Sequence, residues 1–190
     1  MQNKTELRQE LLAARKALPA GQRASLDNAI AAKILGWWQE SGVQTLGVYW
    51  PMRGEPDLHA LYAELAVRGV QLALPAATAG QPLQFLPWRP GETIVRDRFG
   101  AGVPAVARDA VQPQALIIPC VGFNSARFRL GYGGGFYDRT LAQAPRPYAI
   151  GVAYAIGETR FEIGPHDIPL DAIATDRALL AGQKKRTGMR

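Results

Sequence analysis

Cysteine and histidine are nearly absent from this sequence, and their scarcity limits its chemistry. Of the 190 residues, one is cysteine and two are histidine. A single cysteine cannot form an internal disulfide, which is typical of proteins kept in a reducing compartment. These three residues are also too few for a zinc site built from cysteine and histidine. We expect Cys120 to be a small buried thiol rather than a nucleophile, because neither His59 nor His166 is near it in sequence.

Long apolar runs and a basic face are absent as well. No apolar run approaches the length of a membrane span, and the first residues lack the apolar core of a secretory signal. The formal charge is +6, but residues 1–180 carry only +2 (18 basic minus 16 acidic residues). The excess lies in the last ten residues, on Lys184, Lys185, Arg186 and Arg190. We therefore predict a cytoplasmic, monomeric protein that binds small molecules and neither nucleic acid nor membranes.

What is present is an alternation of amphipathic and apolar segments. We expect helices at 4–17, 25–39, 56–69 and 136–144, and strands at 45–50, 70–74, 83–88, 115–119 and 147–154. In the first helix the expected buried stripe is Leu7, Leu11, Ala14 and Leu18. Lys4, Arg8 and Arg15 follow a second line, which for basic residues on a helix is usually a solvated face. This order predicts a three-layer α/β/α single domain over residues 1–180, with a mainly parallel sheet and a flexible basic tail over 181–190.

The stretch from Arg129 to Arg139, RLGYGGGFYDR, most needs a functional explanation. Four glycines within five positions remove packing and free the unfolded chain, so they favour a backbone that approaches a ligand closely. The order of strand, glycine-rich turn and helix start suits a phosphate, and Arg129 and Arg139 supply positive charge at the two ends. Asp138 falls where the magnesium of a nucleotide would lie. The alternative is a surface turn that caps a helix, with Asp138 as an ordinary first-turn acid.

The string matches neither the P-loop nor the dinucleotide fingerprint. It resembles the signature of the 5-formyltetrahydrofolate cyclo-ligase family, the methenyltetrahydrofolate synthetases, at every fixed position of Arg-Leu-Gly-x-Gly-x-Gly-aromatic-Tyr-Asp. Other segments resemble the family in the same order along the chain. They are the Lys4/Arg8 pair, the loop 49–55, the loop 98–104 and the two acids Asp167 and Asp171. The span 124–129 departs slightly from the family pattern, in which many members have aspartate and glycine.

The resemblance implies a role for each of these segments. The implied nucleotide site comprises Lys4, Arg8, Arg129, Leu130, Gly131, Tyr132, Gly133, Gly134, Gly135, Phe136 and Tyr137. The implied folate site comprises Trp50, Glu55 and Phe99, with the Glu55 carboxylate accepting the paired N–H donors of the pterin ring. The implied ligands of one Mg²⁺ ion are Asp138 and Asp167. The alternatives are a solvated helix face for Lys4 and Arg8, a polar loop for the acids, and a core anchor for Phe99.

The function implied by the resemblance is the closure of 5-formyltetrahydrofolate to 5,10-methenyltetrahydrofolate, with ATP consumed and ADP and phosphate released. Its partners would be ATP and a reduced folate. Transfer of a phosphoryl group to the formyl oxygen would activate it as an imidate phosphate, so no protein nucleophile is expected. Two other classes stay open: a sugar-phosphate isomerase or CoA transferase on a related α/β scaffold, and a folate or nucleotide binder without turnover.

Overall fold

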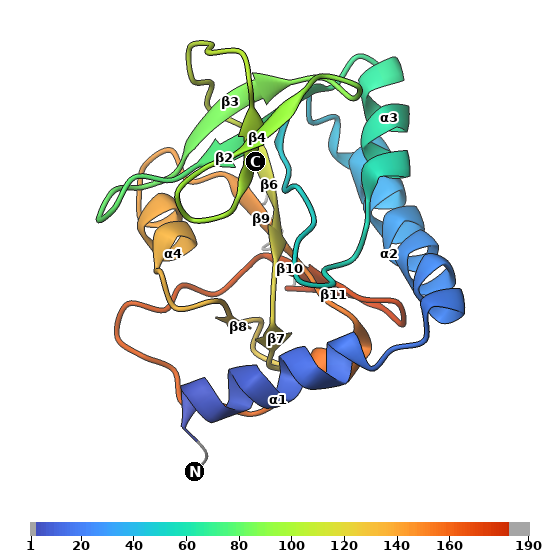
Figure 1. The fold of residues 1–190 in the computed structure, drawn as a ribbon, viewed down its shortest axis with the longest axis vertical. Coiled ribbons are helices and arrows are strands. Elements are labelled where there is room, and N and C mark those ends of the chain that lie inside the picture. Colours follow the sequence, from blue (N-terminus) through green and yellow to red (C-terminus); the bar gives the residue numbers. More distant parts are fainter. Residues whose placement is uncertain (1–2, 183–190) are drawn as a thin grey trace, which may run out of the picture.

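The computed structural model describes residues 3–182 of the chain, which alternate between helices and short strands (Figure 1). The helices are α1 (Lys4–Lys16), α2 (Ala20–Ser41), α3 (His59–Val67) and α4 (Phe136–Leu141), with a 3-10 turn, η1, at Ala155–Gly157. The strands are β1 (Thr45–Gly47), β2 (Gln71–Ala76), β3 (Gln84–Trp88), β4 (Ile94–Arg96), β5 (Gly102–Pro104), β6 (Ala115–Pro119), β7 (Gly122–Phe123), β8 (Arg129–Leu130), β9 (Tyr148–Val152), β10 (Ala172–Ala174) and β11 (Leu179–Ala181). Nearly all of the tail predicted over 181–190 lies outside the described residues.

Seven strands form one central sheet in the order β11-β10-β9-β6-β1-β2-β3. The five inner strands are parallel, and only the two edge strands, β3 and β11, run antiparallel to their neighbours. This confirms the predicted mainly parallel sheet. After β1 the chain adds β2 on one side and then returns to add β6 on the other side. The carboxyl ends of β1 and β6 therefore diverge at a switch point, which is where open α/β sheets bind ligands.

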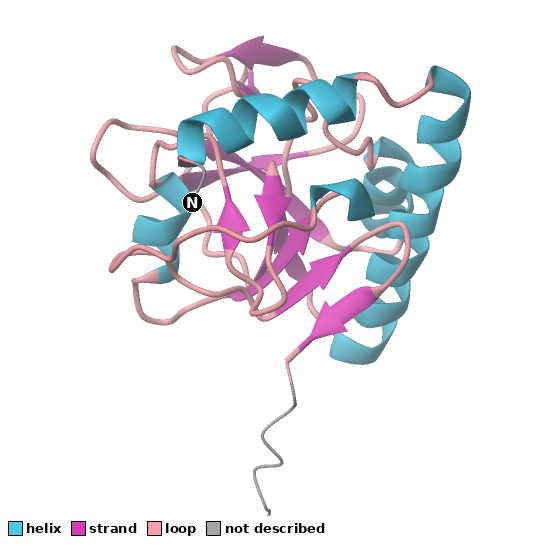
Figure 2. Cartoon of the chain, turned by 90° about the horizontal axis from the view of Figure 1, so that it is seen from below, coloured by secondary structure: helices cyan, strands magenta, loops and turns pink. Residues whose placement is uncertain are grey.

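Both faces of this sheet are covered by helices. In β6, Ile117 packs in the cluster that contains residues of α2 and α3, whereas Leu116 and Ile118 pack in the cluster that contains Leu141 of α4. Side chains of successive strand residues point to opposite faces, so these two clusters lie on opposite sides of the sheet. Figures 1 and 2 show α2 and α3 on one side of the sheet and α4 on the other. The three predicted layers are confirmed, although the α4 layer is thin.

α1 differs from its predicted range by one residue, and the other three helices differ by more. The second helix was expected at 25–39, but α2 begins at Ala20 and continues to Ser41. The third helix begins at His59 rather than Pro56. At its start, the Asp57 side chain accepts a hydrogen bond from the His59 N–H. The fourth helix was expected to reach residue 144 but ends at Leu141. Residue 144 precedes Pro145, and the residue before a proline is disfavoured in a helix.

The buried face of α1 also differs from the prediction. Arg15, expected on the solvated line, is only 4% exposed, while Ala14, expected in the buried stripe, is exposed. The physical reason is the position of this helix. It does not lie flat on the apolar sheet but runs beside β7, β8 and η1 (Figure 1), so its inner face meets polar loops at the carboxyl edge. Leu7 is buried there as expected.

Candidate active site

A cavity of about 470 Å³ opens at the carboxyl edge of the sheet, beside the switch point between β1 and β6. Its walls include every residue that the sequence analysis assigned to a ligand. These are Lys4, Arg8, Trp50, Glu55, Phe99, Arg129, Leu130, Gly131, Tyr132, Gly133, Gly134, Gly135, Phe136, Tyr137, Asp138 and Asp167. The fold thus gathers into one site segments that are up to 163 positions apart in the sequence.

Other wall residues were not predicted from the sequence. They are Tyr49, Met52, Arg53, Pro75, Ala77, Leu83, Ala101, Gly102 and Pro119. Met52 and Arg53 belong to the same turn as Glu55, so the place of that turn after β1 was an available signal. Pro75, Ala77 and Leu83 carried no comparable signal, because the path of the chain around β2 and β3 brings them to the cavity.

The glycine-rich string forms the wall beside α1. Gly133 has a φ of +97° and Gly135 a φ of +64°, a region that other residues rarely adopt. The Nε of Arg8 donates a hydrogen bond of 2.6 Å to the carbonyl of Gly131, which fixes α1 to the string. The string is anchored by Leu130, whose buried side chain belongs to β8. Backbone conformation therefore explains glycine at 133 and 135, and at Gly134 a Cβ would lie only 2.8 Å from the ring of Phe136.

Cations surround the start of this string. Arg129 is only 6% exposed, and its Nη2 donates to Oδ2 of Asp138 over 2.7 Å. Among the described residues its Nη1 has no hydrogen-bond partner. A buried guanidinium donor without a partner is costly, and an anionic oxygen would satisfy it. Arg139 was expected to add charge at the other end, but it donates to the carbonyls of Gly134 and Gln81 and does not line the cavity.

The two carboxylates predicted to hold a metal are brought together by the fold. Oδ1 of Asp138 accepts a 3.2 Å hydrogen bond from the N–H of Ile168, the residue that follows Asp167. Oδ2 of Asp167 accepts from Nζ of Lys4 and from the N–H of Gly164. Burial opposes ionisation of Asp167, but these two hydrogen bonds outweigh it and lower the pKa of the carboxyl group. Asp167 therefore presents ionised oxygens beside the Asp138 side chain.

This pair of carboxylates fits magnesium in the chemistry of its donors. Oxygen is the ligand that Mg²⁺ prefers, and the ion commonly takes one or two carboxylates and completes its shell with phosphate oxygens and water. No group of three or more metal-ligating side chains occurs within residues 3–182, so the protein would supply two ligands. Asp171 is placed elsewhere. It pairs with Arg146 and accepts from the N–H of Ala149, at the start of β9.

Aromatic rings and one buried acid form another part of the wall. Trp50 packs edge-to-face against His59 and Trp88, with ring centroids 4.4 and 5.8 Å away. Phe99 lies between β4 and β5 and contacts Phe136, with centroids 5.1 Å apart. Phe99 is 39% exposed, so its alternative role as a core anchor is wrong. Exposed aromatic surface at a cavity can stack on a planar ligand.

Glu55 is 6% exposed and is held from two sides. Its Oε2 accepts from the N–H of Met52 over 2.9 Å, and its Oε1 accepts from the hydroxyl of Tyr132 over 2.7 Å. Burial raises the pKa of Glu55, and these hydrogen bonds and the charge of Arg15 oppose the rise. Arg15 was missed as a site residue because its helical spacing suggested a solvated face.

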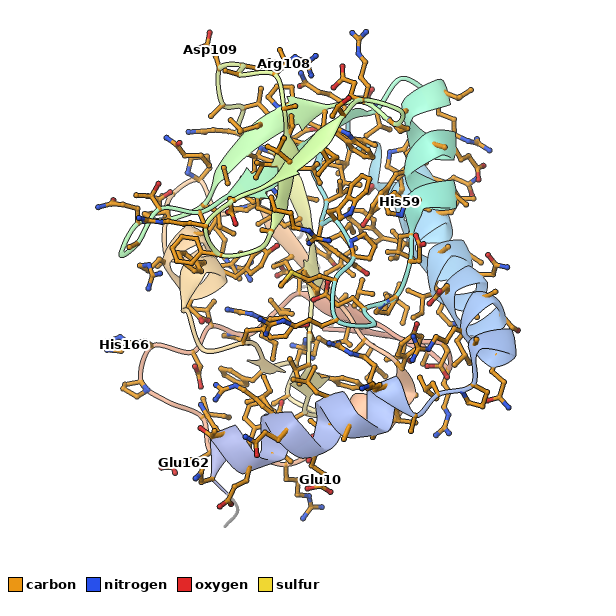
Figure 3. The ribbon with its side chains drawn as sticks, in the orientation of Figure 1. Glu10, His59, Arg108, Asp109, Glu162 and His166 are labelled. Carbon is orange, nitrogen blue, oxygen red and sulfur yellow. The ribbon has the colours of Figure 1, made fainter. Side chains whose placement is uncertain are left out.

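Cys120 is buried, as the sequence analysis expected. It is 1% exposed, and burial raises the pKa of its thiol to about 12. The two histidines lie on opposite sides of the molecule in Figure 3, His59 on α3 and His166 on an exposed loop. The thiol instead contacts the carbonyl of Ile118. Cys120 is thus a structural residue beneath the site.

Comparison with known proteins places the chain in the same family that its motifs indicated. The model of the 5-formyltetrahydrofolate cyclo-ligase family matches residues 1–176. A protein from Mycolicibacterium smegmatis named 5-formyltetrahydrofolate cyclo-ligase is 31% identical, and the match covers 92% of this chain and 94% of that protein. A protein of the same name from Escherichia coli K12 is 30% identical, and the match covers 85% of this chain and 93% of that protein. The solved structure of Aquifex aeolicus 5,10-methenyltetrahydrofolate synthetase superposes with a TM-score of 0.81 at 26% identity, covering 98% of this chain and 96% of that one. The chain belongs to the 5-formyltetrahydrofolate cyclo-ligase family.

Proposed function

We propose that this protein is an ATP- and magnesium-dependent ligase that closes 5-formyltetrahydrofolate to 5,10-methenyltetrahydrofolate and releases ADP and phosphate. Membership of the family supports the reaction. The single observation that carries the proposal is the make-up of one cavity, in which cations, glycine amides, paired carboxylates and aromatic rings meet. A nucleotide's phosphates and a planar reduced folate need these groups.

The nucleotide phosphates lie against the glycine-rich string in this proposal. Backbone N–H groups of the string donate to phosphate oxygens, and Lys4, Arg8 and Arg129 supply positive charge from one side. The partnerless Nη1 of Arg129 supports this arrangement, because a phosphate oxygen would complete its hydrogen bonding. Asp138 and Asp167 would hold the metal, which when bound neutralises charge on the phosphate oxygens.

The folate lies against Trp50, Glu55 and Phe99. Each oxygen of the Glu55 carboxylate already accepts one hydrogen bond from the protein and keeps a further lone pair. These lone pairs accept the adjacent N–H donors of the pterin ring and so fix its orientation. The rings of Trp50 and Phe99 offer apolar walls that exclude water from the ring system.

The protein's part in the chemistry is positioning and charge neutralisation. The formyl oxygen attacks the γ-phosphorus of ATP, the bond to the ADP oxygen breaks, and an imidate phosphate forms. Nitrogen 10 of the folate then attacks the activated formyl carbon. The carbon–oxygen bond breaks, phosphate leaves with the proton that nitrogen 10 gives up, and the five-membered ring closes. Lys4, Arg8 and Arg129 offset the negative charge that moves between these oxygens, and no step requires a side-chain nucleophile.

We also propose that the protein acts in the cytoplasm, as a monomer, on small molecules alone. Its single cysteine and near-neutral body support this setting. Among residues 3–182, no helix has both the length and the apolar character needed to cross a membrane.

The test is the formation of the methenyl product, followed by its absorbance, from 5-formyltetrahydrofolate in the presence of ATP and Mg²⁺. We expect equal amounts of ADP and methenyl product, and loss of turnover when either ATP or the metal is withheld. Conversion that needs no ATP would favour an isomerase-like enzyme. Tight binding of the folate without any turnover would favour a non-catalytic binder, and either outcome would contradict the proposal.

A further inference from the structure

A buried arginine of α1 reaches the acid that we place at the folate. The guanidinium of Arg15 donates from Nη2 to the hydroxyl oxygen of Tyr132 over 2.7 Å, and from Nη1 to the carbonyl of Cys120 over 3.3 Å. The Tyr132 hydroxyl in turn lies 2.7 Å from Oε1 of Glu55. Arg15, Tyr132 and Glu55 therefore form one continuous chain of hydrogen bonds between the first helix and the turn after β1.

The direction of these hydrogen bonds is set by the chemistry of the three groups. A guanidinium has only donors and keeps its proton, so the Tyr132 oxygen must accept from Arg15. The hydroxyl has a single hydrogen, which is then directed to the Glu55 carboxylate. The Arg53 guanidinium lies 5.0 Å from the Tyr132 ring centroid and adds a cation–π contact. Tyr132 is thus held in one orientation by cations from two segments.

We infer that Arg15 is a positioning residue that acts through Tyr132 to fix the Glu55 carboxylate for the folate ring. This inference rests on the proposed function, because it takes Glu55 as the acceptor of the pterin N–H groups. It also changes the role of Tyr132. Although Tyr132 belongs to the glycine-rich string assigned to the nucleotide, its hydroxyl serves the folate.

The energetic reason for such a device is the burial of Glu55. A carboxylate removed from water favours its neutral form, which would present a proton where the folate presents donors. The hydrogen bond from Tyr132 and the charge of Arg15 both favour the ionised form. Burial remains the larger effect and raises the pKa of Glu55, and Tyr132 and Arg15 limit that rise in favour of the accepting carboxylate.

The main test is Tyr132→Phe, which removes the hydroxyl and keeps the ring. We expect the KM for 5-formyltetrahydrofolate to rise about tenfold, which corresponds to one charge-assisted hydrogen bond. The Kd for ATP, measured by calorimetry without folate, should change by less than about twofold. Arg15→Lys should raise the same folate KM. The double variant should have a folate KM no higher than that of the worse single variant, because both changes break the same chain of hydrogen bonds.

Tyr154→Phe is the matched control. The Tyr154 hydroxyl also donates to a carboxylate over 2.7 Å, that of Asp27, but Tyr154 does not line the cavity. This variant should leave both constants unchanged. If Tyr132→Phe kept the original folate KM, or weakened ATP binding as much as folate binding, the inference would be overturned.

The failure of this inference can be told apart from the failure of the proposed function. If the unmodified protein makes no methenyl product, the proposed function fails. The inference is then judged by direct binding of 5-formyltetrahydrofolate, followed by tryptophan fluorescence. Weaker binding by Tyr132→Phe than by the original protein would support it, and equal binding would contradict it. Should Arg15→Lys not fold, Tyr132→Phe still decides the outcome.

Discussion

Nζ of Lys4 and Oδ2 of Asp167 form an ion pair of 2.8 Å, although 163 positions separate the two residues. Arg129 and Asp138 form a second pair of 2.7 Å in the same cavity. In both pairs, a cation that we assign to phosphate neutralises a carboxylate that we assign to the metal. We therefore expect nucleotide and metal to bind together. In that state Lys4 and Arg129 would contact phosphate oxygens, and Asp167 and Asp138 would contact the metal.

Replacing Lys4 should weaken nucleotide binding. In Lys4→Gln the phosphates lose one charge-assisted partner and Asp167 loses its counter-ion, so we expect the Kd for ATP to rise roughly tenfold. Calorimetric titration with ATP and Mg²⁺ measures this change. Lys16→Gln is the matched control, because Lys16 is exposed in the last turn of the same helix. Equal ATP affinity in Lys4→Gln and the original protein would remove Lys4 from the site.

Replacing Asp138 should reduce turnover and its response to metal. Asparagine at this position would keep the size of the side chain but lose the negative charge, so we expect kcat to fall roughly 100-fold for Asp138→Asn. The concentration of Mg²⁺ needed for half-maximal activity should rise. The control is Asp109→Asn, because Asp109 is exposed at the far end of the molecule from α1 (Figure 3). Full activity in Asp138→Asn would show that the metal is held elsewhere.

The buried thiol should be silent in catalysis. A pKa of about 12 and 1% exposure leave almost no accessible thiolate at neutral pH. We expect a thiol reagent to label Cys120 slowly in the native protein and rapidly after unfolding in urea. Cys120→Ala should keep its turnover and lose about 1 kcal/mol of stability, because it leaves a small cavity. Rapid native labelling that tracks loss of activity would contradict this prediction.

Glu55 should make the stability of the protein depend on pH. Its folded-state pKa is raised above the ordinary value of 4.5 because it is buried. Its contribution to stability is then fully present below the unfolded pKa and is lost as pH rises through the folded pKa. The original protein should therefore lose free energy of unfolding relative to Glu55→Gln as the pH rises from about 4.5 upward through the folded pKa. Urea unfolding of both proteins across this range measures the difference, and a difference that stays constant would be contrary to a raised pKa.

Much of the fold was predictable because periodicity reports which face of a segment is buried. The parallel strand at 115–119 was predicted with its observed bounds, since a continuous apolar run is typical of a strand covered on both faces. The string around Gly133 was recognisable for a related reason. Its conformation depends on glycine locally, so the residue types themselves mark the site.

The sequence by itself determined the layered α/β class, the family signature and the part of the cavity wall that the family motifs mark. Only the tertiary structure decided that Lys4 pairs with Asp167, and that Arg15 is buried against Tyr132. The helical pattern of α1 assigned Arg15 to solvent because it assumed that the helix packs on an apolar sheet. At the carboxyl edge the helix meets carbonyls and a hydroxyl instead. Which surface a helix meets depends on long-range packing, and its own periodicity does not contain that information.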